Sequence, residues 1–389
     1  MHLKKVLINS CFVGLCVVVG IFLYNHKHQT YPMNEEYAIS GTETTITNSE
    51  EVIPYPTEYI KEVDEKFKFD VTIKAGNAMS GKEFPLALAQ KQLMNKELIV
   101  DEFIGSDLLP VSYQSKDLER KKIILDIYED EERYLALSDY EFTYMKSPDI
   151  DYIFHTFFPD SKTDQYNSFL YSTSSDLDFM TREQAWEMVV DHMQELNIDM
   201  TLAIPYTVYS MDLETMIQEE RYVDHNNNIV LEDKNPQWDK EEEGYLYFIT
   251  QEYEGIPFYA YPNIEQGDEE TIAPMEIYQN ARGMIEVKLM RWFDIMEQKE
   301  TSRLLPIESI MSVIEEKYKG TLHTNALTVK NASLFIFPIN NKDGNYVLTP
   351  VWVCRIEEKH EDLGLQSYES YIYMAINALT AEEMPSLVY

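Results

Sequence analysis

Apolar and polar positions change their spacing several times along the chain, and each spacing predicts a different element. Residues 6–24 are apolar except for Asn9 and Ser10 among clearly polar types, a run long enough to cross a hydrocarbon core of about 30 Å. Strict alternation over Phe67–Ile73 predicts a strand, because successive side chains of a strand point to opposite faces. Apolar residues three and four apart between Ala185 and Leu196 predict a helix.

Two helix starts carry their own signals. Thr181 and Gln184 have the spacing of a capping box, in which each side chain bonds to the backbone at the position of the other. Pro306 suits a first helical turn and precedes an apolar stripe from Ile307 to Tyr318. The stretch Phe84–Leu98, with Pro85 near its start, is also predicted to be helical.

Strands are expected to follow both of these helices, so the chain reads as α+β. After the second helix, Leu327–Phe337, Tyr346–Ile356 and Tyr368–Ala378 have strand character, and Asn377-Ala378 matches an earlier Asn280-Ala281. The order of helix and strands thus suggests two tandem helix-plus-antiparallel-sheet units. The expected organisation is a membrane anchor or signal segment at 1–28, a disordered tether at 29–62, a mixed α+β region at 63–179, and the two units at 180–300 and 301–389.

The N-terminal apolar run has three interpretations. Lys4 and Lys5 precede it, so an uncleaved transmembrane helix at 6–24 would place the rest of the chain outside the cytoplasm. A cleaved signal peptide needs small residues at its cleavage site, which the end of this run lacks. Lipidation of Cys11 or Cys16 is the third possibility. The uncleaved anchor is favoured, and it predicts a single-pass protein of the cell membrane.

Charge limits the partners of the folded part. No Asp or Glu precedes residue 29, while three lysines do, so residues 29–389 carry 68 acidic and 29 basic residues. Such a surface repels nucleic acid, and no basic stripe is present to bind phosphate. Cys354 is the one cysteine beyond the N-terminal run, which excludes an internal disulfide scaffold.

Motifs near the C-terminus resemble those of a known family. Leu304–Met311, Leu348–Val353 and Met374–Ala381 are similar to the C-terminal unit of YycH/YycI-type regulators and of related PepSY-like units in Gram-positive surface proteins. In the family the last of these motifs usually ends in an acidic residue after Gly, whereas this chain has Ala381 and then Glu382. The resemblance covers about residues 304–383. It implies a non-catalytic extracytoplasmic module that acts on a partner protein, for instance a sensor kinase.

The family pattern offers no catalytic residue to carry over. The resemblance implies structural roles for its matching positions: a strand-edge proline at Pro350, a core indole at Trp352 and a turn amide at Asn377.

The sequence carries none of the common enzyme signatures that can be read from short motifs. The chain has no HExxH, GxSxG, CxxC or Gly-rich phosphate loop, and no cofactor is expected. Residues 224–235 place oxygen donors as a calcium loop does, but Ile229 replaces the glycine and Asn235 the final glutamate, so calcium binding there stays open. His192 is expected to be a core histidine rather than a metal ligand.

Three hypotheses follow. The first is a membrane-tethered, non-enzymatic protein that binds or regulates a partner protein at the bacterial cell surface. The second is a module that binds wall polymer or a small solute through tyrosine-rich strands, with Tyr245, Tyr247, Tyr259 and Tyr261 as the ligand surface. The third is a hydrolase that uses two carboxylates in a cleft.

Overall fold

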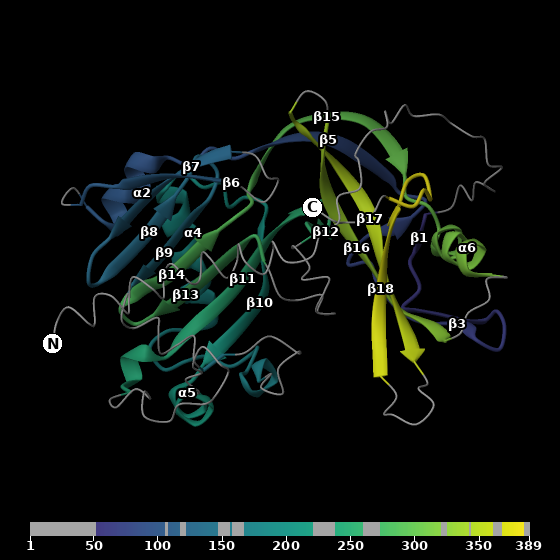
Figure 1. Ribbon diagram of the computed structural model, residues 1–389, viewed down its shortest axis with the longest axis horizontal. Helices are drawn as coiled ribbons and strands as arrows, with labels where there is room; N and C mark the ends of the chain where they lie inside the picture. Colours follow the sequence, from purple (N-terminus) through teal and green to yellow (C-terminus); the bar gives the residue numbers. More distant parts are fainter. Residues whose placement is uncertain are drawn as a thin grey trace. The chain divides into compact units, whose positions relative to one another are not determined.

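Alternating apolar positions become strands throughout the part of the chain that the structure resolves in detail. The structure is a computed structural model, and it describes residues 52–105, 108–116, 122–146, 156–157, 167–220, 238–259, 273–319, 325–341, 344–360 and 368–384. Two large sheets and a small one dominate it, with short helices beside them (Figure 1). The mixed α+β class expected from the sequence is confirmed, with sheet as the larger share.

The larger sheet has nine strands in the order β10-β11-β13-β14-β9-β8-β7-β6, with β12 paired to β11. All of its pairings are antiparallel. Its strands are β6 Val111–Lys116, β7 Lys122–Glu129, β8 Arg133–Leu137, β9 Phe142–Lys146, β10 Ala203–Met211, β11 Gly244–Tyr253, β12 Ile256–Pro257, β13 Met275–Asn280 and β14 Gly283–Leu289.

The second sheet has seven strands in the order β15-β5-β17-β16-β3-β2, with β18 paired to β17. Its strands are β2 Glu58–Glu62, β3 Phe67–Lys74, β5 Glu83–Lys91, β15 Phe293–Arg303, β16 Ala326–Asn340, β17 Tyr346–His360 and β18 Tyr368–Asn377. Only β3 and β16 run parallel in it. The short strands β1 Ile53–Pro54 and β4 Met79–Ser80 pair with each other.

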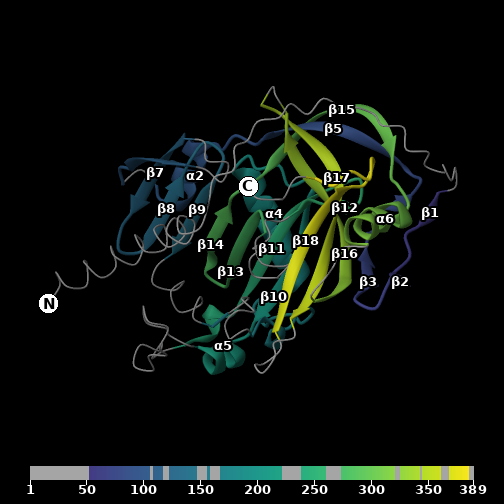
Figure 2. The ribbon, with the colours of Figure 1, turned by 45° about the vertical axis from the view of Figure 1, so that its right-hand side comes forward.

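Four α-helices lie in the described ranges: α2 Lys96–Phe103, α4 Arg182–Glu195, α5 Leu213–Glu219 and α6 Ile307–Tyr318, with 3-10 turns η1 Ser168–Leu170 and η3 Lys240–Glu242. The predicted capping box at Thr181 and Gln184 is formed, and it starts α4. The buried side of α4 packs on the nine-stranded sheet together with α2. Helix α6 lies beside the seven-stranded sheet (Figure 2). Its buried Ile and Met side chains belong to the same core as that sheet.

The centre of the seven-stranded sheet is the stretch around Trp352. The indole of Trp352 is fully buried and meets the ring of Tyr55 edge-on at 5.1 Å. Cys354 and Leu348 share this buried face, as alternation along β17 requires. Trp352 is therefore a core indole, as expected.

Pro350 lies at a change of partner along β17 rather than at an outer edge. The second neighbour of β17 is β5 up to Leu348 and β18 from Val351 onward. A proline lacks the N–H that a ladder needs, so the gap between two partners is a place where it costs little. The expected turn amide is also present, because Asn377 Oδ1 accepts from the backbone N–H of Leu379 and Thr380.

A buried glutamine connects the two large sheets. On β11, the Gln251 side chain donates from Nε2 to the carbonyl oxygen of Phe293 at 2.8 Å and accepts from the N–H of Phe293 at 2.9 Å. Phe293 is the first residue of β15 in the other sheet. The amide thus satisfies both backbone groups of a buried residue where the chain passes between the sheets.

Several expectations need correction. The region 63–179 is not a separate layer, because β3 and β5 join the C-terminal strands in one sheet and β6–β9 join β10–β14 in the other. Likewise β15, within the expected unit 180–300, pairs with β5. The predicted tether extends too far, since residues 58–62 form β2 against β3.

The helix expected at Phe84–Leu98 is also wrong. This stretch contains strand β5 and only the first residues of α2. The predicted span 6–24 lies outside the described residues, and no helix among those that the structure describes is both long enough and apolar enough to cross a membrane.

Candidate functional site

The tyrosines expected to form a ligand surface are mostly structural. Tyr245 and Tyr247 on β11 are buried beneath α4, and the Tyr245 hydroxyl accepts from the N–H of Leu177 and donates to the carbonyl of Met180, both at 2.7 Å. Tyr259 stacks on Phe337 with ring centroids 4.3 Å apart. Tyr261 lies outside the described residues. For Tyr245 and Tyr247 the predicted ligand surface is therefore wrong.

The described residues add no support for metal binding at residues 224–235 or at His192. Residues 224–235 lie outside the described part of the chain. Among the described residues, no three His, Cys, Asp or Glu side chains gather as metal ligands would. His192 lies beside the ring of Phe103, 5.9 Å between centroids, with Glu102 Oε1 at 3.5 Å from Nε2.

A polar ring that the sequence did not reveal lies where β17 and β18 begin to pair. His360 Nε2 is 2.8 Å from Ser370 Oγ, and Asn325 Nδ2 is 2.9 Å from both His360 Nδ1 and Glu358 Oε1. Glu358 and Ser370 are opposite each other in the strand register. The residue types are those of a nucleophile, a base and an acid.

The direction of the hydrogen bonds argues against a catalytic triad. Glu358 can only accept, so it requires the amide nitrogen of Asn325 on its side. That nitrogen then donates to His360 Nδ1, which puts the imidazole proton on Nε2, facing Ser370. A triad needs the opposite tautomer, with the free electron pair on the nitrogen that faces the serine. The ring is therefore better explained as a brace between the two strands.

A buried ion cluster occupies one face of the nine-stranded sheet. Lys288 on β14 forms ion pairs with Glu286 and with Glu276 on β13, the latter at 3.5 Å. Burial raises the pKa of Glu286 to about 7, although Lys288 opposes the shift. Burial lowers the pKa of Lys288, but the two carboxylates outweigh it and leave that pKa above its usual value.

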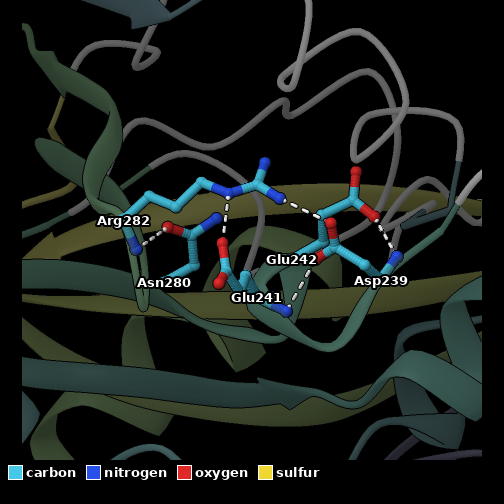
Figure 3. Close-up of polar contacts among 5 residues, drawn as sticks. All are labelled: Asp239, Glu241, Glu242, Asn280 and Arg282. Atoms are coloured by element: carbon cyan, nitrogen blue, oxygen red, sulfur yellow. Dashed lines mark hydrogen bonds and ion pairs between the residues drawn. The ribbon is translucent and has the colours of Figure 1, made fainter.

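Figure 3 shows a second charged junction, around the turn between β13 and β14. The Arg282 guanidinium is 2.8 Å from Asp239 Oδ2 and 3.1 Å from Glu241 Oε2, and Asn280 Oδ1 accepts from the Arg282 N–H. Glu242 accepts from the N–H of Asp239, which closes the capping box of η3. The two ion pairs of Arg282 join the turn to η3, and the other two contacts lie within the turn and within η3, so the junction is structural.

The feature that most resembles a binding site is a surface at one end of the nine-stranded sheet. We define the edge surface as Leu109, Val111 and Tyr113, whose exposed fractions are 89%, 56% and 54%. Val111 and Tyr113 lie on one face of β6, which is the last strand of the sheet (Figure 1). Ile124 on β7 is also exposed, but it pairs with Gln114 and so points to the other face. Large apolar side chains gathered at an exposed place indicate contact with another molecule.

Comparison with known proteins places the fold but not the activity. The chain matches no protein-family model and no curated protein. Among solved structures it is similar to an uncharacterised protein from Eubacterium rectale, with a TM-score of 0.56 and 18% sequence identity over 85% of this chain and 94% of that one. The chain therefore shares the α+β fold of that protein along most of its length.

Proposed function

We propose that the protein is held at the cell membrane by residues 6–24 and binds a partner protein outside the cytoplasm, regulating it without catalysing a reaction. The observation that carries this proposal is the edge surface, where Leu109, Val111 and Tyr113 expose apolar side chains at the last strand of the sheet. The chain is otherwise strongly acidic, with 68 acidic residues against 32 basic ones, so an exposed apolar strip stands out as a place for contact.

The tandem units expected from the sequence add support. Helix α4 is followed by the antiparallel strands β10, β11 and β13, and α6 is followed by β16, β17 and β18 in the same neighbour order. The third strand of each set ends in an asparagine, Asn280 or Asn377, whose Oδ1 accepts from the N–H two residues later. This agreement favours a duplicated unit of the YycH/YycI or PepSY-like kind, and with it a role in regulation.

The proposal is tested by crosslinking the full chain in intact cells that produce it, followed by purification under denaturing conditions. We expect a membrane protein, for instance a sensor kinase, to be recovered with it. Recovery of wall polymer and no membrane protein would contradict the proposal and favour the wall-binding alternative. In that case Tyr259→Ala, which changes the one described tyrosine of the predicted ligand surface outside the α4 core, should reduce polymer binding.

A further inference from the structure

Strand β6, which carries two residues of the edge surface, also exposes the backbone along one of its sides. Strand β6 pairs with β7 at all six of its residues, from Val111 opposite Ile127 to Lys116 opposite Lys122, with no shift of register. It ends the sheet, so no described strand lies on its other side. Every second N–H and C=O of such a strand points outward and can pair with an added strand.

Three other sheet ends in the described chain, at β10, β15 and β2, carry features that discourage strand addition. Strand β18, which pairs only with β17, is covered at its end, where the Asn377 N–H and the Ala375 carbonyl bond to Glu382 and Met384, and it carries Glu369 near its start. Strand β10 contains Pro205, shifts register beside it, and has its Ser210 N–H bonded to the carbonyl of Ser172. Strand β15 shifts register twice against β5. Strand β2 has five residues, three of them charged. Proteins protect edges in these ways, with prolines, bulges, charges and short strands.

By contrast, β6 is regular, apolar at Val111 and Tyr113 and free of acidic residues, with Pro110 before it rather than within it. We propose that β6 receives an extended segment of the partner protein as an additional strand of the nine-stranded sheet. This inference rests on the proposed function and specifies how the partner binds. Main-chain hydrogen bonds would supply affinity, and alternate side chains would supply specificity.

The edge also indicates the chemistry of the segment. Val111 and Tyr113 lie on one face of β6, so the added strand should carry apolar residues at every second position on that face. The segment is therefore expected to be extended and alternately apolar.

A second copy of the chain fits this edge less well. Each copy has a formal net charge of -36, and two such surfaces repel each other as they approach. A different protein with a less acidic surface has no such barrier.

The test places a photoreactive phenylalanine analogue at position 111 or 113 of the full chain in cells that produce it. The matched control is position 371, because Tyr371 is also a strand tyrosine and is 43% exposed, close to the 54% of Tyr113. We expect adducts with one membrane protein from positions 111 and 113 and none from 371. The residues that they label in the partner should be two apart, as the period of a strand requires.

A second pair of variants checks the contact independently. With the photoreactive group at 113, Val111→Lys should lower the adduct yield at least about tenfold, because a charge replaces an apolar contact of the added strand. Tyr371→Lys should leave the yield unchanged. Circular dichroism of both variants confirms that they are folded.

Each other outcome decides against the inference in a distinct way. Labelled residues three or four apart would mean that a helix docks. Adducts with the chain itself would identify a second copy as the occupant. If intact-cell crosslinking recovers a membrane protein but positions 111 and 113 do not label it, the strand-addition inference fails and the proposed function stands. If neither experiment recovers a membrane protein, the proposed function fails.

Discussion

The two helix-and-strand units share an order of elements but differ in what they bury. In the C-terminal unit, α6 and β16–β18 enclose a core around Trp352, and none of the described buried residues of this unit is charged. In the preceding unit, α4 covers a core that includes Tyr245 and Tyr247, while Glu286 and Lys288 form buried charges elsewhere in the same sheet.

The difference suggests that the stability of the two units depends on solution conditions to different degrees. An apolar core with close packing stabilises a fold without making it sensitive to solution conditions. Buried hydroxyls and charges need partners, so they make stability depend on each hydrogen bond and on pH. The sheet that carries these polar groups is also the sheet that ends in the edge surface. Four predictions test this comparison.

The largest effect is expected at the centre of the C-terminal unit. Trp352→Ala should lower the free energy of unfolding by about 3–5 kcal/mol, because it leaves a large cavity beside Tyr55 in a closed core. Trp186→Ala, at a partly buried tryptophan on α4 of the other unit, should cost at least about 1 kcal/mol less. Urea denaturation monitored by circular dichroism measures both. If both variants lost the same free energy of unfolding, the two units would not differ in how much these tryptophans stabilise them.

The connection between the sheets comes next. Gln251→Leu should lower the free energy of unfolding by about 2–4 kcal/mol, because it leaves the buried N–H and C=O of Phe293 without the side-chain partner. Gln114→Leu, at an exposed glutamine of β6, should change it by less than about 0.5 kcal/mol. A Gln251→Leu variant as stable as the parent would show that the amide does not join the sheets.

The ion cluster should make stability depend on pH. The pKa of Glu286 is about 7 in the folded chain and ordinary when unfolded, so the folded state binds the proton more tightly and stability falls as pH rises from about 4.5 to about 7. Glu286→Gln removes this titration. Relative to the parent, it should gain about 1–3 kcal/mol between pH 5 and pH 8. Thermal denaturation at several pH values measures it.

A control for this effect is Gln114→Leu, which replaces an exposed side chain that carries no titratable group. Its difference in stability from the parent should not vary over the same pH range. If the stability difference between Glu286→Gln and the parent is also independent of pH, the ion cluster does not make stability depend on pH.

The smallest effect compares two neighbouring hydroxyls. The Tyr247 hydroxyl is buried and has no hydrogen-bond partner in the described structure, so Tyr247→Phe should be neutral or stabilising by up to about 1 kcal/mol. Tyr245→Phe loses two hydrogen bonds and should cost about 1–2 kcal/mol. The same urea denaturation separates them, and a reversed order would contradict the assigned contacts.

Much of the architecture was readable from local patterns. The capping box at Thr181, the strand from Phe67 and the core role of Trp352 each depend on residues close in sequence, and each is present. The stretch after Phe84 was misread as a helix because its apolar spacing is mixed. Its β5 part became a strand through pairing with β15 and β17, more than two hundred residues away.

The edge surface could not be predicted for a related reason. Val111 and Tyr113 look like any half-buried strand residues in sequence, and their exposure follows only from β6 being the last strand of the sheet. For Tyr245 and Tyr247 the opposite holds, because they were expected to be exposed and are buried. Alternation along a strand does not tell which face another element covers, and here α4 covers their face. Which strand is outermost and which face is covered are properties of the complete topology.

The parallel pairing of β3 with β16 has a consequence for how the protein forms. Asp70 and Lys330, which pair across these strands at 2.9 Å, are 260 residues apart, and the Tyr55 hydroxyl reaches the carbonyl of Leu305 across 250. Contacts of such long range slow folding, because a large loop must close before they form. During synthesis, β3 can pair with β2, but its other edge has no strand to pair with until β16 exists. A chain that lacks β16 to β18 would therefore expose β3, and chaperones that bind extended apolar segments would be expected to hold it.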